Sequence, residues 1–189
     1  MVNEEPENPA ETLIRLLTDR GLYLAGAESC TAGLASEMLG RVGGASACFW
    51  GSFVCYTPRA KQAMLGIDPG LLAEYGLVSA ETARAMAAAA LEKSGAAAAF
   101  SVTGLAGPGG DGSSVPLGTV WIGTALWPGN ARPGVSGRPG CAAPGDAGAA
   151  EPVVTARRFV YDGGRNQIRW KAAREALRQI ECQLKINTM

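Results

Sequence analysis

Ser29 is the side chain of this sequence whose position best suits nucleophilic chemistry. It stands in the run Glu28-Ser29-Cys30-Thr31, where an apolar segment gives way to a polar turn and then to a predicted helix. The sequence contains no histidine, which excludes Ser-His-Asp and Cys-His arrangements and removes the commonest zinc ligand. Because a serine needs a neighbouring base to lose its proton, lysine becomes the leading candidate for that base.

Lys61 lies about one turn into the helix predicted after Tyr56. A lysine accepts a proton from serine only when burial or a neighbouring cation lowers its pKa from about 10.4 toward neutrality. The sequence leaves two interpretations of Lys61 open, a solvated surface lysine and a catalytic base. Tyr56 also has two interpretations: it can relay a proton or orient the lysine, or it can be a structural tyrosine at the end of a strand.

The turn after Ser29 also offers backbone donors. If Ser29 attacks a carbonyl carbon, the N–H groups of Cys30 and Thr31 can face the developing oxyanion and contact the substrate. The competing interpretation is that Ser29 or Thr31 caps the following helix, since Ser and Thr are preferred at that position. Cys30 is a further candidate nucleophile, although it has no histidine partner.

A glycine-rich loop and a late arginine are candidates for anion binding. Thr103 ends a predicted buried strand and leads into Gly104-Leu105-Ala106-Gly107-Pro108-Gly109-Gly110. The N–H groups of Gly104 and Gly107 can contact phosphate, or the loop can simply be a tight turn. Its spacing matches neither the Walker A nor the dinucleotide fingerprint. Arg165 opens the last predicted helix, where a bound anion would offset an unfavourable cation at the helix N-terminus; an exposed arginine at a turn is the alternative.

Periodicity and turn residues predict alternating helices and strands around these candidates. Helices are expected at residues 11–20, from the polar turn to about 40, at 58–65, after Asp68-Pro69, at 80–94 and at 164–186, and strands at 22–27, 48–56, 96–103, 117–126 and 153–161. Thr57, Asp68 and Ser79 are the expected helix N-caps, with Gly66 and Gly95 closing helices. The order predicts a single-domain, three-layer α/β/α sandwich with a mixed, largely parallel sheet.

Two segments have compositions that disfavour packing into this sandwich. Residues 1–9 are polar and acidic, and we expect a disordered lead there. Residues 128–152 contain 17 Gly, Pro or Ala among 25, which predicts a flexible excursion between two strands.

The overall composition favours a cytoplasmic protein without nucleic-acid or membrane partners. Lys plus Arg and Asp plus Glu both number 17, so no net field attracts nucleic acid or an anionic membrane. The five cysteines form no C-x-x-C pair, which argues against a disulfide framework. The acidic start MVNEEPENPAE is unlike a signal peptide, and no window reaches the roughly 18 apolar residues of a membrane helix.

Four ordered motifs resemble the CinA C-terminal domain family. They are AESCTAG at 27–33, SFVCYTPRAKQAMLG at 52–66, YGLVSAETARAMA at 75–87 and VTGLAGPGG at 102–110. The resemblance covers residues 10–127 and resumes near Arg157. Many members of that family are nicotinamide mononucleotide amidohydrolases, which release ammonia and leave nicotinic acid mononucleotide. The resemblance therefore implies this deamidation, in pyridine nucleotide salvage, with no metal or redox cofactor.

The resemblance also implies roles for individual residues. Ser29 matches the family's proposed nucleophile, Lys61 its partner base and Tyr56 the supporting position. Thr103 and Arg165 match positions linked to substrate binding.

Family members commonly associate, and the resemblance implies a homo-oligomer here. Trp50 and Phe53 on a predicted strand are the candidate contact between copies. The family is often fused to an N-terminal molybdopterin-binding-like domain, for which 189 residues leave no room. A stand-alone form of the domain is therefore expected.

Three positions depart from the family's usual pattern. A pair of glycines reads Ala32-Gly33, a charged pair before the second strand is lost in Phe49-Trp50-Gly51-Ser52, and a glycine-aspartate-arginine pattern reads Gly163-Gly164-Arg165. These departures motivate an alternative, a non-catalytic nucleotide-binding module of the same fold. A competence- or damage-associated role on DNA is another alternative, and the balanced charge counts against it.

Overall fold

Five strands form one mixed sheet in a computed structural model that describes residues 8–128 and 151–186. The strands are β1 (Leu24–Glu28), β2 (Phe49–Val54), β3 (Ala98–Gly104), β4 (Thr119–Leu126) and β5 (Val153–Val160). Their spatial order is β2-β1-β3-β4-β5, with β1 parallel to β2 and β3, and with β4 antiparallel to both β3 and β5. Every strand except β4 therefore runs in one direction, as the largely parallel sheet was predicted to do.

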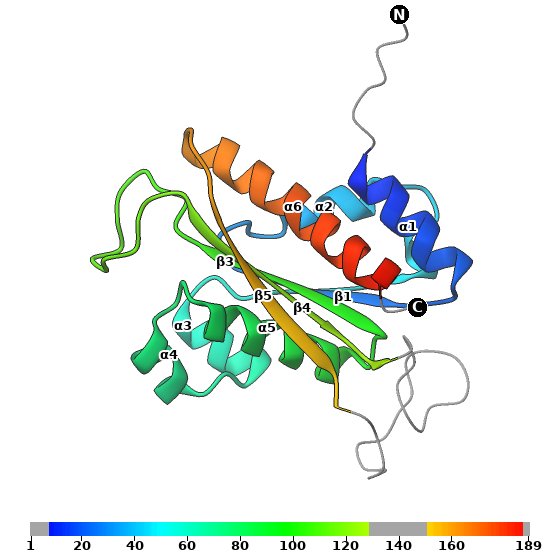
Figure 1. Cartoon of the computed structure of the whole chain (residues 1–189), viewed down its shortest axis with the longest axis horizontal. Helices are drawn as coiled ribbons and strands as arrows, with labels where there is room; N and C mark the ends of the chain where they lie inside the picture. Colours follow the sequence, from blue (N-terminus) through cyan, green and yellow to red (C-terminus); the bar gives the residue numbers. More distant parts are fainter. Residues whose placement is uncertain (1–7, 129–150, 187–189) are drawn as a thin grey trace, which may run out of the picture.

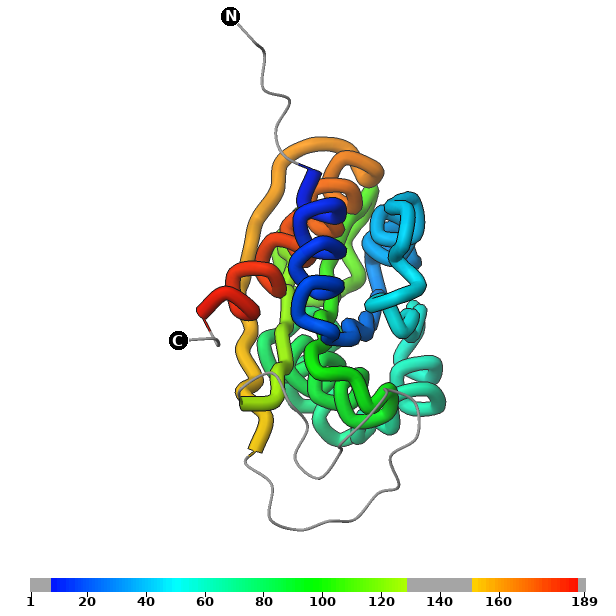
Figure 2. Tube along the Cα trace, turned by 90° about the vertical axis from the view of Figure 1, so that its right-hand side faces the viewer, coloured from blue at the N-terminus to red at the C-terminus, as the bar shows by residue number. Residues whose placement is uncertain are grey.

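Helices cover both faces of this sheet (Figure 1). They are α1 (Pro9–Asp19), α2 (Leu34–Gly40), the 3-10 turn η1 (Ala45–Ala47), α3 (Pro58–Ala60), the π-helical turn η2 (Lys61–Leu65), α4 (Pro69–Tyr75), α5 (Ala80–Ser94) and α6 (Arg165–Ile186). Helices α1, α2 and α6 lie on one face, and α3, α4 and α5 on the other. The predicted three-layer α/β/α sandwich is confirmed. Figure 2 shows α1 lying beside α6.

The predicted helix boundaries follow from their capping residues. Thr57 accepts a hydrogen bond from the N–H of Ala60, and Ser79 accepts one from the N–H of Thr82, so each satisfies a backbone donor that the helix leaves free. Gly66 and Gly95 end η2 and α5 with φ angles of 74° and 68°, a conformation that costs glycine little.

Some boundaries differ from the prediction. The first helix begins at Pro9, because Asn8 caps it and proline suits the first helical position; the expected lead over residues 1–9 was therefore wrong at Pro9. The helix expected over 58–65 changes at Lys61 into a π-helical turn. The excursion predicted over 128–152 lies outside the described residues except at its two ends. In the parts of the chain that the structure describes, no helix has the length and apolarity needed to cross a membrane.

The alanine-rich helix α5 approaches the middle of the sheet closely. Ala83, Ala87 and Ala90 are fully buried, and the Ser101 hydroxyl on β3 donates a hydrogen bond of 2.6 Å to the carbonyl oxygen of Ala83. A Cβ atom at Gly123 on β4 would lie 2.4 Å from that same oxygen. Small residues on both elements therefore set the distance between helix and sheet.

The carboxyl ends of β1, β2 and β3 meet at one edge of the sheet. Glu28, the last residue of β1, is aligned with Val54 on β2 and Val102 on β3. Two backbone hydrogen bonds continue the alignment past the strand, from Ser29 N–H to the Val102 oxygen and from Cys55 N–H to the Glu28 oxygen. Ligands of open α/β sheets bind at this kind of edge. Ser29 and Cys55 thus begin two loops that start side by side.

Replacing Gly123 tests the close approach of α5 to the sheet. Gly123→Ala is expected to lower the free energy of unfolding by about 1–3 kcal/mol, because the new methyl group meets the backbone of α5. Urea denaturation measures this change. Gly40→Ala is the matched control, since nothing lies within 4 Å of a Cβ atom there. Equal stability of the two variants would contradict the packing argument.

Candidate active site

Lys61 and Ser29 face one another at the carboxyl edge of the sheet. Ser29 follows β1 directly, and Lys61 is the first residue of the π-helical turn η2. The Lys61 amino group donates hydrogen bonds to Ser29 Oγ at 2.7 Å and to the carbonyl oxygen of Cys55 at 3.1 Å. Single π-helical turns often occur at functional sites. The structure therefore brings together the serine and the lysine that the sequence singled out.

Burial changes the acid–base properties of Lys61. Its side chain is 1% exposed, so the interpretation as a solvated surface lysine is wrong. Loss of solvation lowers the pKa of Lys61 below the ordinary lysine value, and the nearby thiols of Cys55 and Cys30 oppose this only in part. Within the described residues, no carboxylate lies within ion-pair distance of Lys61 to stabilise its charge. A neutral amine beside a hydroxyl is the arrangement that general-base activation of serine requires.

The helix cap expected at Ser29 or Thr31 is supplied instead by Glu28. Helix α2 begins only at Leu34. The fully buried carboxylate of Glu28 accepts hydrogen bonds from the N–H groups of Gly33, Ala35 and Ser36 at 3.0, 3.1 and 2.8 Å, and from the Ser36 hydroxyl at 2.5 Å. A carboxylate is well placed at the positive end of a helix. The hydroxyl of Ser29 is thereby left free for Lys61.

Two backbone donors next to Ser29 have no acceptor on another residue. In the part of the chain that the structure describes, the Thr31 N–H has no recorded acceptor, and the Cys30 N–H contacts only the thiol of its own residue. Unpaired N–H groups beside a nucleophile suit an oxyanion. The Cys30 thiol itself is a poor nucleophile, because burial raises its pKa to about 12 despite the opposing charge of Lys61.

A cavity of about 160 Å³ opens onto this pair. It is lined by Ser29, Cys30, Tyr56, Lys61, Leu77, Val78, Thr103, Gly104, Leu105, Ala106, Gly107, Asp111 and Arg165. Eight of the nine candidate site residues thus line one space; Thr31, which is fully buried, does not.

Arg165 and Tyr56 meet at one side of the cavity. The Arg165 guanidinium donates to the Tyr56 hydroxyl and to the carbonyl oxygen of Gly107. Tyr56 is 49% exposed, and its hydroxyl pairs with Arg165 rather than with Lys61. The Thr103 hydroxyl donates to the Leu77 oxygen at 2.6 Å, so it joins two walls of the cavity. Arg165 is therefore an exposed arginine, as one interpretation had it, but it is hydrogen-bonded on the cavity wall.

The three departures from the family's pattern all lie off the cavity wall. Ala32 is exposed and has a φ angle of 53°, a conformation that strains any residue with a Cβ atom. Trp50 is 43% exposed on the edge strand β2, where its ring stacks on Phe53 at 5.5 Å. Gly164 is exposed just before α6. None of the three narrows the space beside Ser29.

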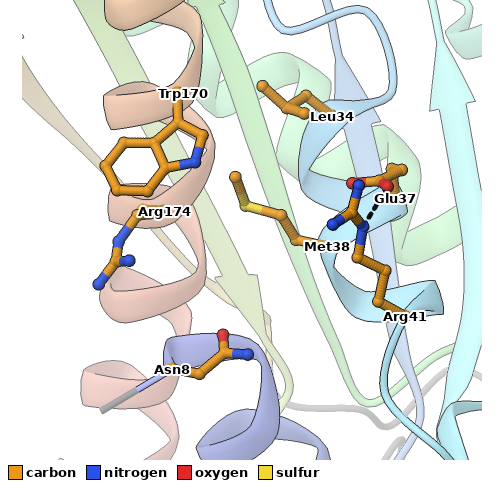
Figure 3. A pocket seen from close by; sticks show the side chains of 7 residues that line it. All are labelled: Asn8, Leu34, Glu37, Met38, Arg41, Trp170 and Arg174. Carbon is orange, nitrogen blue, oxygen red and sulfur yellow. Dashed lines mark hydrogen bonds and ion pairs between the residues drawn. The ribbon is translucent and has the colours of Figure 1, made fainter. Parts of the chain in front are cut away.

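A second hollow lies among α1, α2 and α6 (Figure 3). Its volume is about 470 Å³, and it is lined by Asn8, Leu34, Glu37, Met38, Arg41, Trp170 and Arg174. Arg41 pairs with Glu37, and the Arg174 guanidinium stacks over the Trp170 ring at 4.6 Å. None of the seven described residues that line this larger hollow is a serine, cysteine or lysine. Size alone therefore does not identify the active site.

Sequence reasoning missed Glu28, Arg169 and Asp111. Glu28 ends a buried strand, which gave no reason to expect a helix cap. Arg169 lies within the helix predicted over 164–186, and in the structure it donates to the carbonyl oxygens of Cys30 and Thr31. A signal for it existed: Arg165 and Arg169 are one helical turn apart and so share a face.

Comparison with known proteins identifies the family. The CinA C-terminal domain family matches residues 6–133. This chain belongs to that family. A CinA-like protein of Chlorobaculum tepidum is 39% identical over 177 residues, which cover 93% of this chain and 37% of the relative. One from Chloroherpeton thalassium is 49% identical over 115 residues, covering 61% of this chain and 27% of the relative. The chain spans about a third of the length of such curated relatives.

Solved structures of the CinA family share the whole fold. The competence/damage inducible protein CihA from Agrobacterium tumefaciens is 34% identical, with a TM-score of 0.75 over 95% of this chain and 97% of its own. The competence damage-inducible protein A from Klebsiella pneumoniae is 26% identical, with a TM-score of 0.78 over 95% of this chain and 98% of its own. The mixed five-stranded sheet with helices on both faces is therefore a CinA-family architecture.

Glu28→Gln tests the buried helix cap. The amide NH₂ of glutamine would face backbone N–H donors, so the free energy of unfolding is expected to fall by about 1–3 kcal/mol. Glu37→Gln on α2, the helix that Glu28 caps, is the control, because the exposed ion pair of Glu37 with Arg41 contributes little to stability. Thermal and urea denaturation compare the variants. If Glu28→Gln lost no more stability than Glu37→Gln, the assigned cap would be wrong.

Proposed function

We propose that this CinA-family protein hydrolyses the carboxamide of nicotinamide mononucleotide, giving nicotinic acid mononucleotide and ammonia. The observation that carries the proposal is the 2.7 Å contact between Lys61 Nζ and Ser29 Oγ, in buried surroundings that favour the neutral amine. The pair supports attack on an amide carbon. The choice of substrate rests on the resemblance to family members that are nicotinamide mononucleotide amidohydrolases.

The first half of the reaction forms an acyl-enzyme. Neutral Lys61 takes the proton of the Ser29 hydroxyl as Oγ bonds to the carboxamide carbon. Negative charge moves to the carboxamide oxygen, where the N–H group of Cys30 on the cavity wall stabilises it. The C–N bond then breaks, and the Lys61 ammonium gives its proton to the departing nitrogen. Ammonia leaves, and Lys61 is neutral again.

The second half of the reaction restores Ser29. Lys61 takes a proton from a water molecule, whose oxygen attacks the acyl carbon. The oxyanion forms a second time, and the Cys30 N–H group stabilises it again. Collapse of this intermediate breaks the bond to Ser29 Oγ, which recovers its proton from Lys61. No group beyond these residues and water is needed to balance either half.

The cavity supports an orientation for the nucleotide. Its apolar side, with Leu77 and Val78, suits the pyridine ring, and Arg165 suits the phosphate as a bidentate donor. Gly104 and Gly107 also line this space, and their backbone atoms can contact the substrate. The carboxamide then lies toward Ser29 and the phosphate toward Arg165.

Removing either member of the pair tests the reaction. Ser29→Ala and Lys61→Met are each expected to lower kcat for ammonia release by at least about a thousandfold, because each removes a group that reacts directly. Ammonia released from nicotinamide mononucleotide by the purified protein is the measurement.

Matched controls separate chemistry from folding. Ser46→Ala and Lys93→Met change exposed residues of the same types and should keep wild-type kcat. Full activity in Ser29→Ala would overturn the mechanism. Binding of the nucleotide by wild-type protein without ammonia release would instead support a non-catalytic nucleotide-binding module.

The lowered pKa of Lys61 predicts two pH dependences. Because the neutral amine is the active form, kcat/KM should rise with pH through a pKa clearly below the ordinary value of about 10.4. At a pH between the lowered pKa of Lys61 in the folded protein and the ordinary lysine pKa of the unfolded chain, the unfolded chain binds a proton that the folded protein does not. The free energy of unfolding should therefore increase with pH in this interval. Lys61→Met lacks the group and should lose this increase. A kcat/KM profile that is flat up to about pH 10 would exclude Lys61 as the base.

A further inference from the structure

The first two turns of α6 bind the site loops together. Arg165 donates to Tyr56 and to the Gly107 oxygen, and Arg169, one turn later, reaches the turn that follows Ser29. Its Nε donates to the Cys30 oxygen at 3.2 Å, and one terminal nitrogen donates to the Thr31 oxygen at 2.8 Å. Two of the three acceptors of this single guanidinium are thus carbonyls of the turn that follows Ser29.

Peptide geometry links these carbonyl contacts to the free N–H groups. In a trans peptide the carbonyl of one residue and the N–H of the next point in opposite directions. The Cys30 oxygen points to Arg169, so the Thr31 N–H points away from α6. In the same way, the Ser29 oxygen accepts from the Ala32 N–H at 3.0 Å, which orients the Cys30 N–H. Each free donor is therefore fixed through the carbonyl of its own peptide.

The charge of Arg169 adds to this orientation. Its third nitrogen donates to the Asn166 side chain at 3.2 Å, and no carboxylate in the described ranges 8–128 and 151–186 forms an ion pair with it. The charge of the guanidinium strengthens its hydrogen bonds to the Cys30 and Thr31 oxygens. These bonds hold the turn that carries the Cys30 N–H.

We propose that Arg169 is a positioning residue that holds the Cys30–Thr31 turn in place and so orients the Cys30 N–H as an oxyanion donor at the cavity, an inference that rests on the proposed amidohydrolase function. Arg169 does not touch the substrate in this role; it acts through the backbone. It should therefore affect the transition state, in which the oxyanion exists, and leave ground-state binding nearly unchanged.

Steady-state kinetics of ammonia release test the proposal. Arg169→Ala is expected to lower kcat by roughly ten- to a hundredfold, a fraction of the loss that removal of an oxyanion donor causes, with KM within about threefold of wild type. Guanidinium ion at millimolar concentration should restore part of kcat in Arg169→Ala and none in Ser29→Ala. Arg174→Ala, which changes another arginine of α6, is the control and should keep wild-type kcat.

Either of two results would overturn the proposal. Wild-type kcat in Arg169→Ala would mean that the turn needs no guanidinium. A rise in KM with unchanged kcat would mean that Arg169 binds the substrate directly. The kinetics are referred to the concentration of folded protein, measured by circular dichroism, so that loss of stability does not imitate loss of kcat.

A second reaction separates this proposal from the choice of substrate. Acetylation of Ser29 by p-nitrophenyl acetate, followed by peptide mass spectrometry, also passes through an oxyanion but needs no nucleotide. If wild-type protein released no ammonia, the proposed function would fail while this assay still tested Arg169. Slower acetylation of Ser29 in Arg169→Ala would support the positioning role, and acetylation at the wild-type rate would overturn it.

Discussion

A buried amine is the constraint on which the rest of the site depends. Among the residues that the structure describes, Lys61 has a hydroxyl and a carbonyl as its hydrogen-bond partners and no carboxylate. Burial of this kind disfavours the charged form, and it persists only where the surrounding structure is stable enough to impose it. The α/β/α sandwich supplies that stability through its buried central strands and the close packing of α5.

The site is assembled from loops that are each held by a buried or charged group of the scaffold. Glu28 fixes the start of α2, which frees the preceding turn from helix capping. Arg165 and Arg169 connect α6 to the loops after β1, β2 and β3. Catalytic groups held in this way need little reorganisation during a reaction, which is how preorganised sites stabilise transition-state charge.

Much of the fold could be predicted because its signals are local. Thr57, Ser79, Gly66 and Gly95 mark helix ends by their own chemistry, and the alternation of elements then indicates the layers. The serine–lysine pair was also accessible, since the lack of histidine left few bases to consider. The burial of Lys61 was not, because it depends on residues distant in sequence.

The same limit explains the residues that were missed. Glu28 and Arg169 bind backbone segments that the fold places beside them. In sequence these segments lie five to eight residues from Glu28 and more than a hundred residues from Arg169. For Arg169 the sequence offers only its spacing of one helical turn from Arg165, which places both on one face of α6 but does not indicate what Arg169 contacts. A role that consists of contacts with backbone atoms leaves no pattern of residue types to recognise.

The pairing of β4 with β5 separates the site from sequence variation elsewhere. Leu126, the last residue of β4, is aligned with Val153, the first of β5. The chain therefore leaves the sheet and re-enters it at adjacent points, and because β4 is antiparallel to β3 these points lie at the edge opposite Ser29. The length of the connection can change through evolution, or a reporter domain can be grafted there, while the strand register that aligns the catalytic loops stays the same.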